Sequence, residues 1–138
     1  MNKHFFIAWI VLFVVWMGGS FLIHGILLYD EYAQLPNLYR TETASQQLFH
    51  WMLLAHFMMA GGFAWLYSRG IENRPWLGQG LRFGIVINLF AVAPTYLIYY
   101  TVIPNPASLV IGQVIYDSVL TLLLGLLVAF IYRNQPAR

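Results

Sequence analysis

The last hydrophobic stretch of the chain, Ala107–Tyr132, reads ASLVIGQVIYDSVLTLLLGLLVAFIY and decides the fold. It exceeds the about 20 residues that an α-helix needs to cross the hydrocarbon core of a bilayer. It also contains Asp117, the only acidic or basic side chain well inside any apolar stretch of this chain. Because a carboxylate in hydrocarbon is unfavourable, the stretch predicts a membrane-spanning helix with one face turned toward protein or water.

Three other apolar stretches of spanning length precede it, at about 5–29, 45–67 and 81–102. Of the 138 residues, 60% are hydrophobic and only 9% are charged. A soluble domain carries about 25% charged residues, so this composition excludes one. No A-x-A-like cleavage site follows the first stretch, which we therefore read as a helix and not a signal peptide. The sequence predicts an all-α membrane protein, a single domain over residues 1–138 in which four transmembrane helices form an antiparallel bundle.

The basic residues predict the orientation of that bundle. Six of the seven Lys and Arg residues lie at the termini or around the second connection (Lys3, Arg69, Arg74, Arg82, Arg133 and Arg138), and Arg40 lies on the opposite side. The positive-inside rule therefore places both termini in the cytoplasm. Such scattered arginines do not form a nucleic-acid-binding face. Because the chain has the general look of small four-helix bacterial membrane proteins, we expect it in the inner membrane, with the lipid bilayer as its surroundings.

Reading Ala107–Tyr132 in steps of four residues gives a narrow polar and small-residue stripe. It consists of Gln113, Asp117, Thr121, Gly125 and Ala129, while large apolar residues occupy most other positions. Side chains spaced in this way share one helix face. We expect that face to lie inside the bundle.

The other predicted helices offer polar groups at depths comparable to that stripe. Counting from the outer boundaries puts Ser20, His56 and Thr95 near the depth of Asp117, and Asn88 deeper. We predict a site for a proton, a cation or a small polar ligand formed by Asp117, His56, Asn88, Gln113, Thr95 and Ser20. In the competing interpretation, Asp117 bonds to His56, Asn88 or Tyr116 and only holds helices together.

Two histidines suggest a second kind of site. His24 and His50 are predicted at matched depth on neighbouring helices, as the two axial ligands of a b-type haem would be. A metal ion with Gln113 as a weak third ligand is a related possibility. The chain has no cysteine and no Cys-x-x-Cys-His motif, and we expect no cofactor.

No catalytic motif is present, which favours a protein that is not an enzyme. Two classes of function remain. One is a binding or conduction bundle, in which the polar layer handles protons, a cation or a small polar ligand. The other is a non-catalytic accessory subunit that docks a partner. Four helices enclose only a thin cavity, so a full conduction path predicts a homo-oligomer or a larger membrane complex.

Local signals predict where the helices begin and bend. Thr43–Gln46 fits a capping box at the start of the second spanning helix. The segment Gly70–Gly80 is expected to be a loop. Pro94 is expected to bend the third spanning helix, since proline removes a backbone hydrogen bond. Asn105 is expected to cap the fourth, with Pro106 at its first position.

Overall fold

The computed structural model describes residues 3–136, and within that range all regular secondary structure is helical, with no strand. In order along the chain the elements are α1 (Lys3–Leu22), the π-helical turn η1 (Ile23–Leu27), α2 (Tyr29–Ala33), α3 (Glu42–Gln47), α4 (Phe49–Arg69), α5 (Trp76–Ile87), the π-helical turn η2 (Asn88–Val92), α6 (Ala93–Val102) and α7 (Ala107–Tyr132). Four continuous helical stretches are long and apolar enough to cross a membrane: Lys3–Leu27, Phe49–Arg69, Trp76–Val102 and Ala107–Tyr132. The predicted all-α class and the four helices of spanning length are confirmed.

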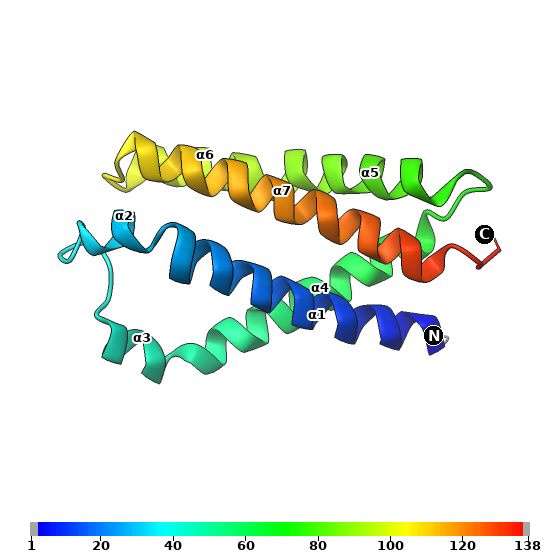
Figure 1. Cartoon of the computed structure of the whole chain (residues 1–138), viewed down its shortest axis with the longest axis horizontal. Helices are drawn as coiled ribbons and strands as arrows, with labels where there is room; N and C mark the ends of the chain where they lie inside the picture. The colour runs from blue at the N-terminus through cyan, green and yellow to red at the C-terminus, as the bar shows by residue number, and fades with distance from the viewer. Residues whose placement is uncertain (1–2, 137–138) are drawn as a thin grey trace.

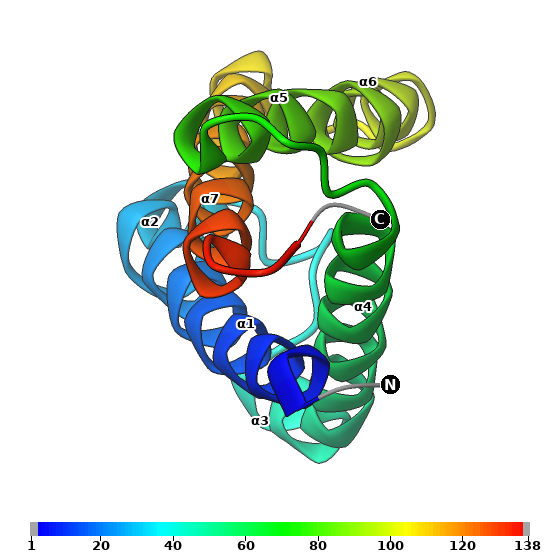
Figure 2. The same cartoon turned by 90° about the vertical axis from the view of Figure 1, so that its right-hand side faces the viewer.

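Helix α7 lies between α1 on one side and α5 with α6 on the other (Figures 1 and 2). Its side chains supply much of the apolar core, with Leu109, Leu124 and Val128 fully buried. The core continues from α7 toward α1 through Leu12 and Trp16. Helix α7 therefore contacts both α1 and the stretch formed by α5 and α6.

Small residues bring α5 and α7 into direct backbone contact. A Cβ placed on Gly125 of α7 would lie 2.5 Å from the carbonyl oxygen of Gly80 and 2.9 Å from the backbone nitrogen of Gly84. Any side chain at Gly125 would therefore push the two helices apart. Close packing through small residues is how membrane helices commonly associate, because lipid provides no hydrophobic force between them.

Helix α4 packs along α1 by aromatic contacts. The indole N–H of Trp9 donates to the carbonyl oxygen of Phe57 at 2.7 Å, and the same ring lies against Gly61. Farther along, the rings of Trp16 and Phe63 meet edge to face, with centroids 5.5 Å apart. The N-terminal end of α4 and the short α3 lie far from α6 (Figures 1 and 2).

Two of the four spanning stretches contain a π-helical turn, η1 in the first and η2 in the third. Pro94 lies in the first turn of α6, directly after η2. Since Pro94 has no N–H to donate, the preceding turn cannot keep the α-helical hydrogen-bond pattern. A wider π-helical turn thus lies just before Pro94, where the sequence predicts a bend.

The structure starts two helices elsewhere than predicted. The Thr41 hydroxyl accepts a hydrogen bond from the Ala44 N–H, so α3 begins before the predicted capping box. Leu48 then leaves helical geometry, and α4 starts only at Phe49. The third stretch begins at Trp76, so residues 76–80, expected to be loop, lie in α5, where Gly80 contacts α7.

The predicted cap of the fourth spanning helix is wrong. Pro106 is the capping residue of α7, which starts at Ala107 and has no side-chain cap. The Asn105 side chain instead accepts a hydrogen bond from the Tyr39 hydroxyl, at 2.6 Å. This bond ties the long connection between α2 and α3 to the tight turn between α6 and α7.

Candidate functional site

The predicted stripe on α7 is buried along its whole length. Gln113, Asp117 and Thr121 are among the few buried polar side chains of residues 3–136, and Gly125 and Ala129 are buried as well. The prediction that this face lies inside the structure is confirmed. Asp117 is only 8% exposed, so its surroundings are protein side chains.

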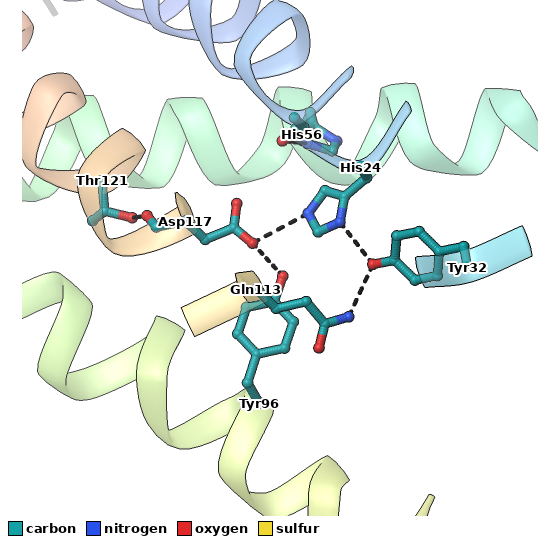
Figure 3. Close-up of polar contacts among 8 residues, drawn as sticks. His24, Tyr32, His56, Tyr96, Gln113, Asp117 and Thr121 are labelled. Carbon is teal, nitrogen blue, oxygen red and sulfur yellow. Dashed lines mark hydrogen bonds and ion pairs between the residues drawn. The ribbon is translucent and has the colours of Figure 1, made fainter. Parts of the chain in front are cut away.

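The carboxyl group of Asp117 joins two other helical stretches (Figure 3). Its Oδ2 atom lies 3.1 Å from Nε2 of His24, in η1. The same oxygen accepts a short hydrogen bond of 2.5 Å from the Tyr96 hydroxyl, in α6. None of the contacts found among residues 3–136 uses the other oxygen, Oδ1, which points away from His24 and Tyr96 in Figure 3.

The network continues from His24 to α2. Nδ1 of His24 lies 2.8 Å from the hydroxyl of Tyr32, in α2, and the side-chain amide of Gln113 donates to that hydroxyl at 2.9 Å (Figure 3). Residues of four elements, η1, α2, α6 and α7, thus form one continuous network of contacts. In order, its members are Gln113, Tyr32, His24, Asp117 and Tyr96.

These contacts are all satisfied by one assignment of protons. A neutral His24 with its proton on Nε2 donates to Asp117, and its Nδ1 accepts from the Tyr32 hydroxyl. The Tyr32 oxygen then accepts from Gln113, while Oδ2 of Asp117 accepts from both His24 and Tyr96. In this arrangement Asp117 is an ionised carboxylate and the whole network carries one negative charge.

Local helix geometry positions these groups. His24 lies in η1, whose wider turn changes the direction of the side chains relative to a regular α-helix. Tyr96 lies in α6 just beyond Pro94 and η2. The Thr121 hydroxyl donates to the Asp117 carbonyl oxygen one turn earlier, at 2.7 Å. Single π-helical turns inside α-helices are often found at functional sites.

His56 is not a partner of Asp117 in the structure. Its Nδ1 lies 2.9 Å from the Met52 carbonyl oxygen and its Nε2 lies 3.1 Å from the Ser20 hydroxyl. Neutral His56 satisfies both contacts by donating from Nδ1 and accepting from the Ser20 hydroxyl. His56, one of the three partners considered for Asp117, instead forms a separate pair with Ser20 between α4 and α1.

Asn88 and Thr95 also lie outside the Asp117 network. The Ser118 hydroxyl donates to the side-chain oxygen of Asn88 at 2.9 Å, which links η2 to α7. Thr95 is exposed, and its hydroxyl donates to the carbonyl oxygen of Ala91 in its own helix. Of the six residues predicted to form one site, Asp117 and Gln113 belong to this network, Ser20 and His56 bond to each other, Asn88 bonds to Ser118, and Thr95 bonds to its own helix.

His24 and His50 have different surroundings. His50 is exposed, beside the Trp51 ring, whereas both ring nitrogens of His24 are in contact with Tyr32 and Asp117. Within residues 3–136 there is no cluster of three or more His, Cys, Asp or Glu residues able to hold a metal ion. His24 belongs to the Asp117 site.

Residues of α2 and of the connection that follows it cover the end of this network. Tyr32 and Tyr39 meet edge to face with ring centroids 5.0 Å apart, and the Ser108 hydroxyl donates to the Glu31 carboxylate. Burial raises the pKa of Tyr32 to about 12, and the hydrogen bond from Gln113 opposes part of that shift. Burial also raises the pKa of Tyr39. Both tyrosines are therefore neutral hydrogen-bonding groups at physiological pH.

Sequence reasoning missed Tyr32 and Tyr96 as site residues. Tyr96 lies 10 residues before Pro106 and Asp117 lies 11 residues after it. Residues equidistant from a tight turn between two paired helices lie at the same depth, so this spacing could have identified Tyr96. For Tyr32 no comparable signal exists, because it lies in the short helix α2, between the first two spanning stretches. Comparison with family models, curated proteins and solved structures finds no match to this chain.

Proposed function

We propose that this chain is an integral membrane protein whose four apolar helices form an antiparallel bundle with both termini in the cytoplasm. We further propose that it binds a proton or another small cation at Asp117 and His24. Four helices of spanning length and the concentration of Lys and Arg at one set of helix ends support the first part. An excess of Lys and Arg on the cytoplasmic side is the pattern expected of an inner-membrane protein.

The observation that carries the second part is the contact between two ionisable side chains, His24 and Asp117, of which Asp117 is buried between helices. An unbalanced carboxylate at the centre of a bilayer costs about 2.5–3.5 kcal/mol on insertion scales. With neutral His24 the network has no positive charge of its own. A proton taken up by the pair, or a small cation at Oδ1 of Asp117, removes this imbalance.

Proton uptake by the network has a defined chemical consequence. Protonated His24 donates from both ring nitrogens, so Nδ1 can no longer accept the Tyr32 proton. Tyr32 then accepts from His24 and from Gln113, and its own proton must turn to another acceptor. The state of the Asp117 pair is thereby coupled to α2, which lies at the outer end of the chain of bonds.

The polar path supports binding from the outer side and not conduction across the membrane. From Asp117 the bonds lead outward through His24 to Tyr32. In the other direction, between Asp117 and Tyr132, α7 offers only Ser118 and Thr121 as polar side chains. Farther along α7, its backbone contacts that of α5 at Gly125, so no space remains between these two helices there. A site whose polar contacts extend toward one side only can sense or bind a cation without transporting it.

The experiment is a set of melting curves in detergent between roughly pH 5 and pH 8, the range in which histidines commonly titrate. We expect the melting temperature of wild type to depend on pH, and this dependence to disappear in Asp117→Asn and in His24→Gln. His56→Gln is the matched control, since it changes a histidine outside the network. If Asp117→Asn and wild type give superimposable pH profiles, Asp117 has a structural role only.

The accessory-subunit function is the second candidate, and one observation favours it. The stretch Trp76–Val102 packs on α7 by one face and exposes large apolar side chains on the others, with Phe90 82% exposed and Leu89 65% exposed. Lipid would cover such a surface, and so would another copy or a partner helix. A defined oligomer in mild detergent, together with a pH response that is indifferent to Asp117, would establish this function in place of the first.

A further inference from the structure

A polar hollow of about 130 Å³ lies at the inner end of the structure, where the connection between α4 and α5 meets the C-terminal end of α7. Two arginines, Arg74 and Arg133, line it together with Asn73, Gln135 and the Glu72 carboxylate. Since one water takes up about 30 Å³ in the liquid, the hollow has the volume of about four waters. That is room for one phosphate group.

A buried glutamine, Gln79, fixes the shape of the hollow without a ligand. The side chain of Gln79, only 7% exposed, accepts from the Glu72 N–H and donates to the carbonyl oxygens of Glu72 and Arg74. These three bonds hold the short connection in one shape. Tyr132 and Ala129 of α7, both buried, form the opposite wall.

The charges around the hollow are mainly positive. Arg74 and Arg82 both pair with Oε2 of Glu72, at 3.1 and 2.9 Å, so one carboxylate is shared by two guanidinium groups. The hydrogen bond from Arg82 lowers the pKa of Glu72, which keeps that carboxylate ionised and in place. The Arg133 guanidinium lies over the Phe130 ring, 3.8 Å from its centroid. These four side chains together carry a net charge of +2 (three arginines and one glutamate).

An apolar groove of about 200 Å³ adjoins the hollow and shares Tyr67 and Gln79 with it. Phe83 and Val86 of α5 form much of its surface, and Arg82 stands at its edge. A cationic polar hollow next to an apolar groove matches the two parts of a phospholipid, a charged headgroup and the beginning of an acyl chain. A free phosphate ion would use only the hollow.

We propose that an anionic phospholipid binds at this end of the protein, with its headgroup phosphate in the hollow beside Arg74 and Arg133 and an acyl chain along the groove beside Phe83. The inference rests on the membrane insertion proposed above and is independent of Asp117. It places the lipid at the cytoplasmic leaflet, whose anionic lipids attract basic side chains.

The test uses the full chain purified in mild detergent and measures bound lipid by native mass spectrometry during titration with phosphatidylglycerol, with phosphatidylcholine and with inorganic phosphate. We expect retention of phosphatidylglycerol only. Each arginine near a membrane surface strengthens attraction by a factor of about 5, so Arg74→Gln with Arg133→Gln should weaken binding about 25-fold. Arg69→Gln is the matched control, because Arg69 lies over the Trp65 ring and outside the hollow.

Two further variants separate charge from folding. Arg133→Lys should retain most of the binding, because it keeps the charge, and Phe83→Ala should weaken binding of the lipid without creating phosphate binding. Equal losses in Arg69→Gln and in the double variant would overturn the proposal, as would equal retention of phosphatidylcholine. Binding of inorganic phosphate as tight as that of the lipid would replace it with a free-anion site.

Discussion

The contact between Gly125 and the pair Gly80 and Gly84 gives the sharpest stability prediction. In Gly125→Ala the new Cβ would meet backbone atoms, the Gly80 carbonyl oxygen at 2.5 Å and the Gly84 Cα at 2.9 Å. Backbone atoms cannot turn aside as a flexible side chain can, so α5 and α7 must separate. Overpacking of this kind costs typically 1–3 kcal/mol, and the rigid contact places this variant at about 3 kcal/mol.

Gly62→Ala is the matched control for this substitution. Gly62 also lies inside a long helix, α4, but a Cβ there would meet nothing within 4 Å. Both substitutions share the gain in helix propensity, roughly 1 kcal/mol, so their difference isolates the steric term. The comparison therefore does not depend on how large that gain is in a detergent micelle.

The assay is reversible unfolding in mixed micelles with increasing sodium dodecyl sulfate, followed by circular dichroism or tryptophan fluorescence. We expect the free energy of unfolding of Gly125→Ala to lie about 3 kcal/mol below that of Gly62→Ala. Equal stabilities for the two variants would refute the close α5–α7 contact. The proposal that no polar path continues between Asp117 and Tyr132 would then lose its structural basis.

Three other predictions concern the topology, Asp117 and Tyr32. A reporter placed at Asn73 or after Arg138 should report cytoplasm, and a cysteine at Gln34 should be labelled from outside; an external C-terminus would reverse the orientation. Asp117→Leu should lower the free energy of unfolding by about 1–3 kcal/mol for each donor that it leaves unpaired, His24 and Tyr96, whereas Asp117→Asn should not. Burial raises the pKa of Tyr32 from 10.0 to about 12, so its contribution to stability is complete below pH 10.0 and is lost as the pH rises through about 12; this loss, measured by unfolding, should be smaller in Tyr32→Phe, in which the raised pKa of Tyr39 still contributes.

The spanning helices and the buried stripe of α7 could be predicted because both depend on a simple repeating pattern. An apolar run of spanning length identifies a helix, and residues four apart identify its face. Depth counting also grouped residues that meet, since Ser20 contacts His56, and His24 and Gln113 meet through Tyr32. The length of a helix, its buried face and the depth of its residues can each be predicted from one helix at a time.

The partner of Asp117 could not be predicted in the same way, because depth does not say which helices touch. His56 and Asp117 were placed at similar depth, but α4 packs mainly along α1, where His56 reaches Ser20. The π-helical turn η1 presents His24 to α7 instead. No local sequence pattern predicts that turn, and its effect on side-chain direction is seen only in the structure.

Infrared difference spectroscopy of the Asp117 carboxyl group is the measurement that tests the proposed cation site most directly. Spectra of wild type at roughly pH 5 and pH 8 should differ in a carboxyl band, because proton uptake by the pair changes the bonds at Oδ2. The band should be absent in Asp117→Asn, shifted in Tyr96→Phe, which loses the 2.5 Å bond, and unchanged in His56→Gln. Identical difference spectra for wild type and Asp117→Asn would contradict the proposed site and leave Asp117 as a residue that only holds helices together.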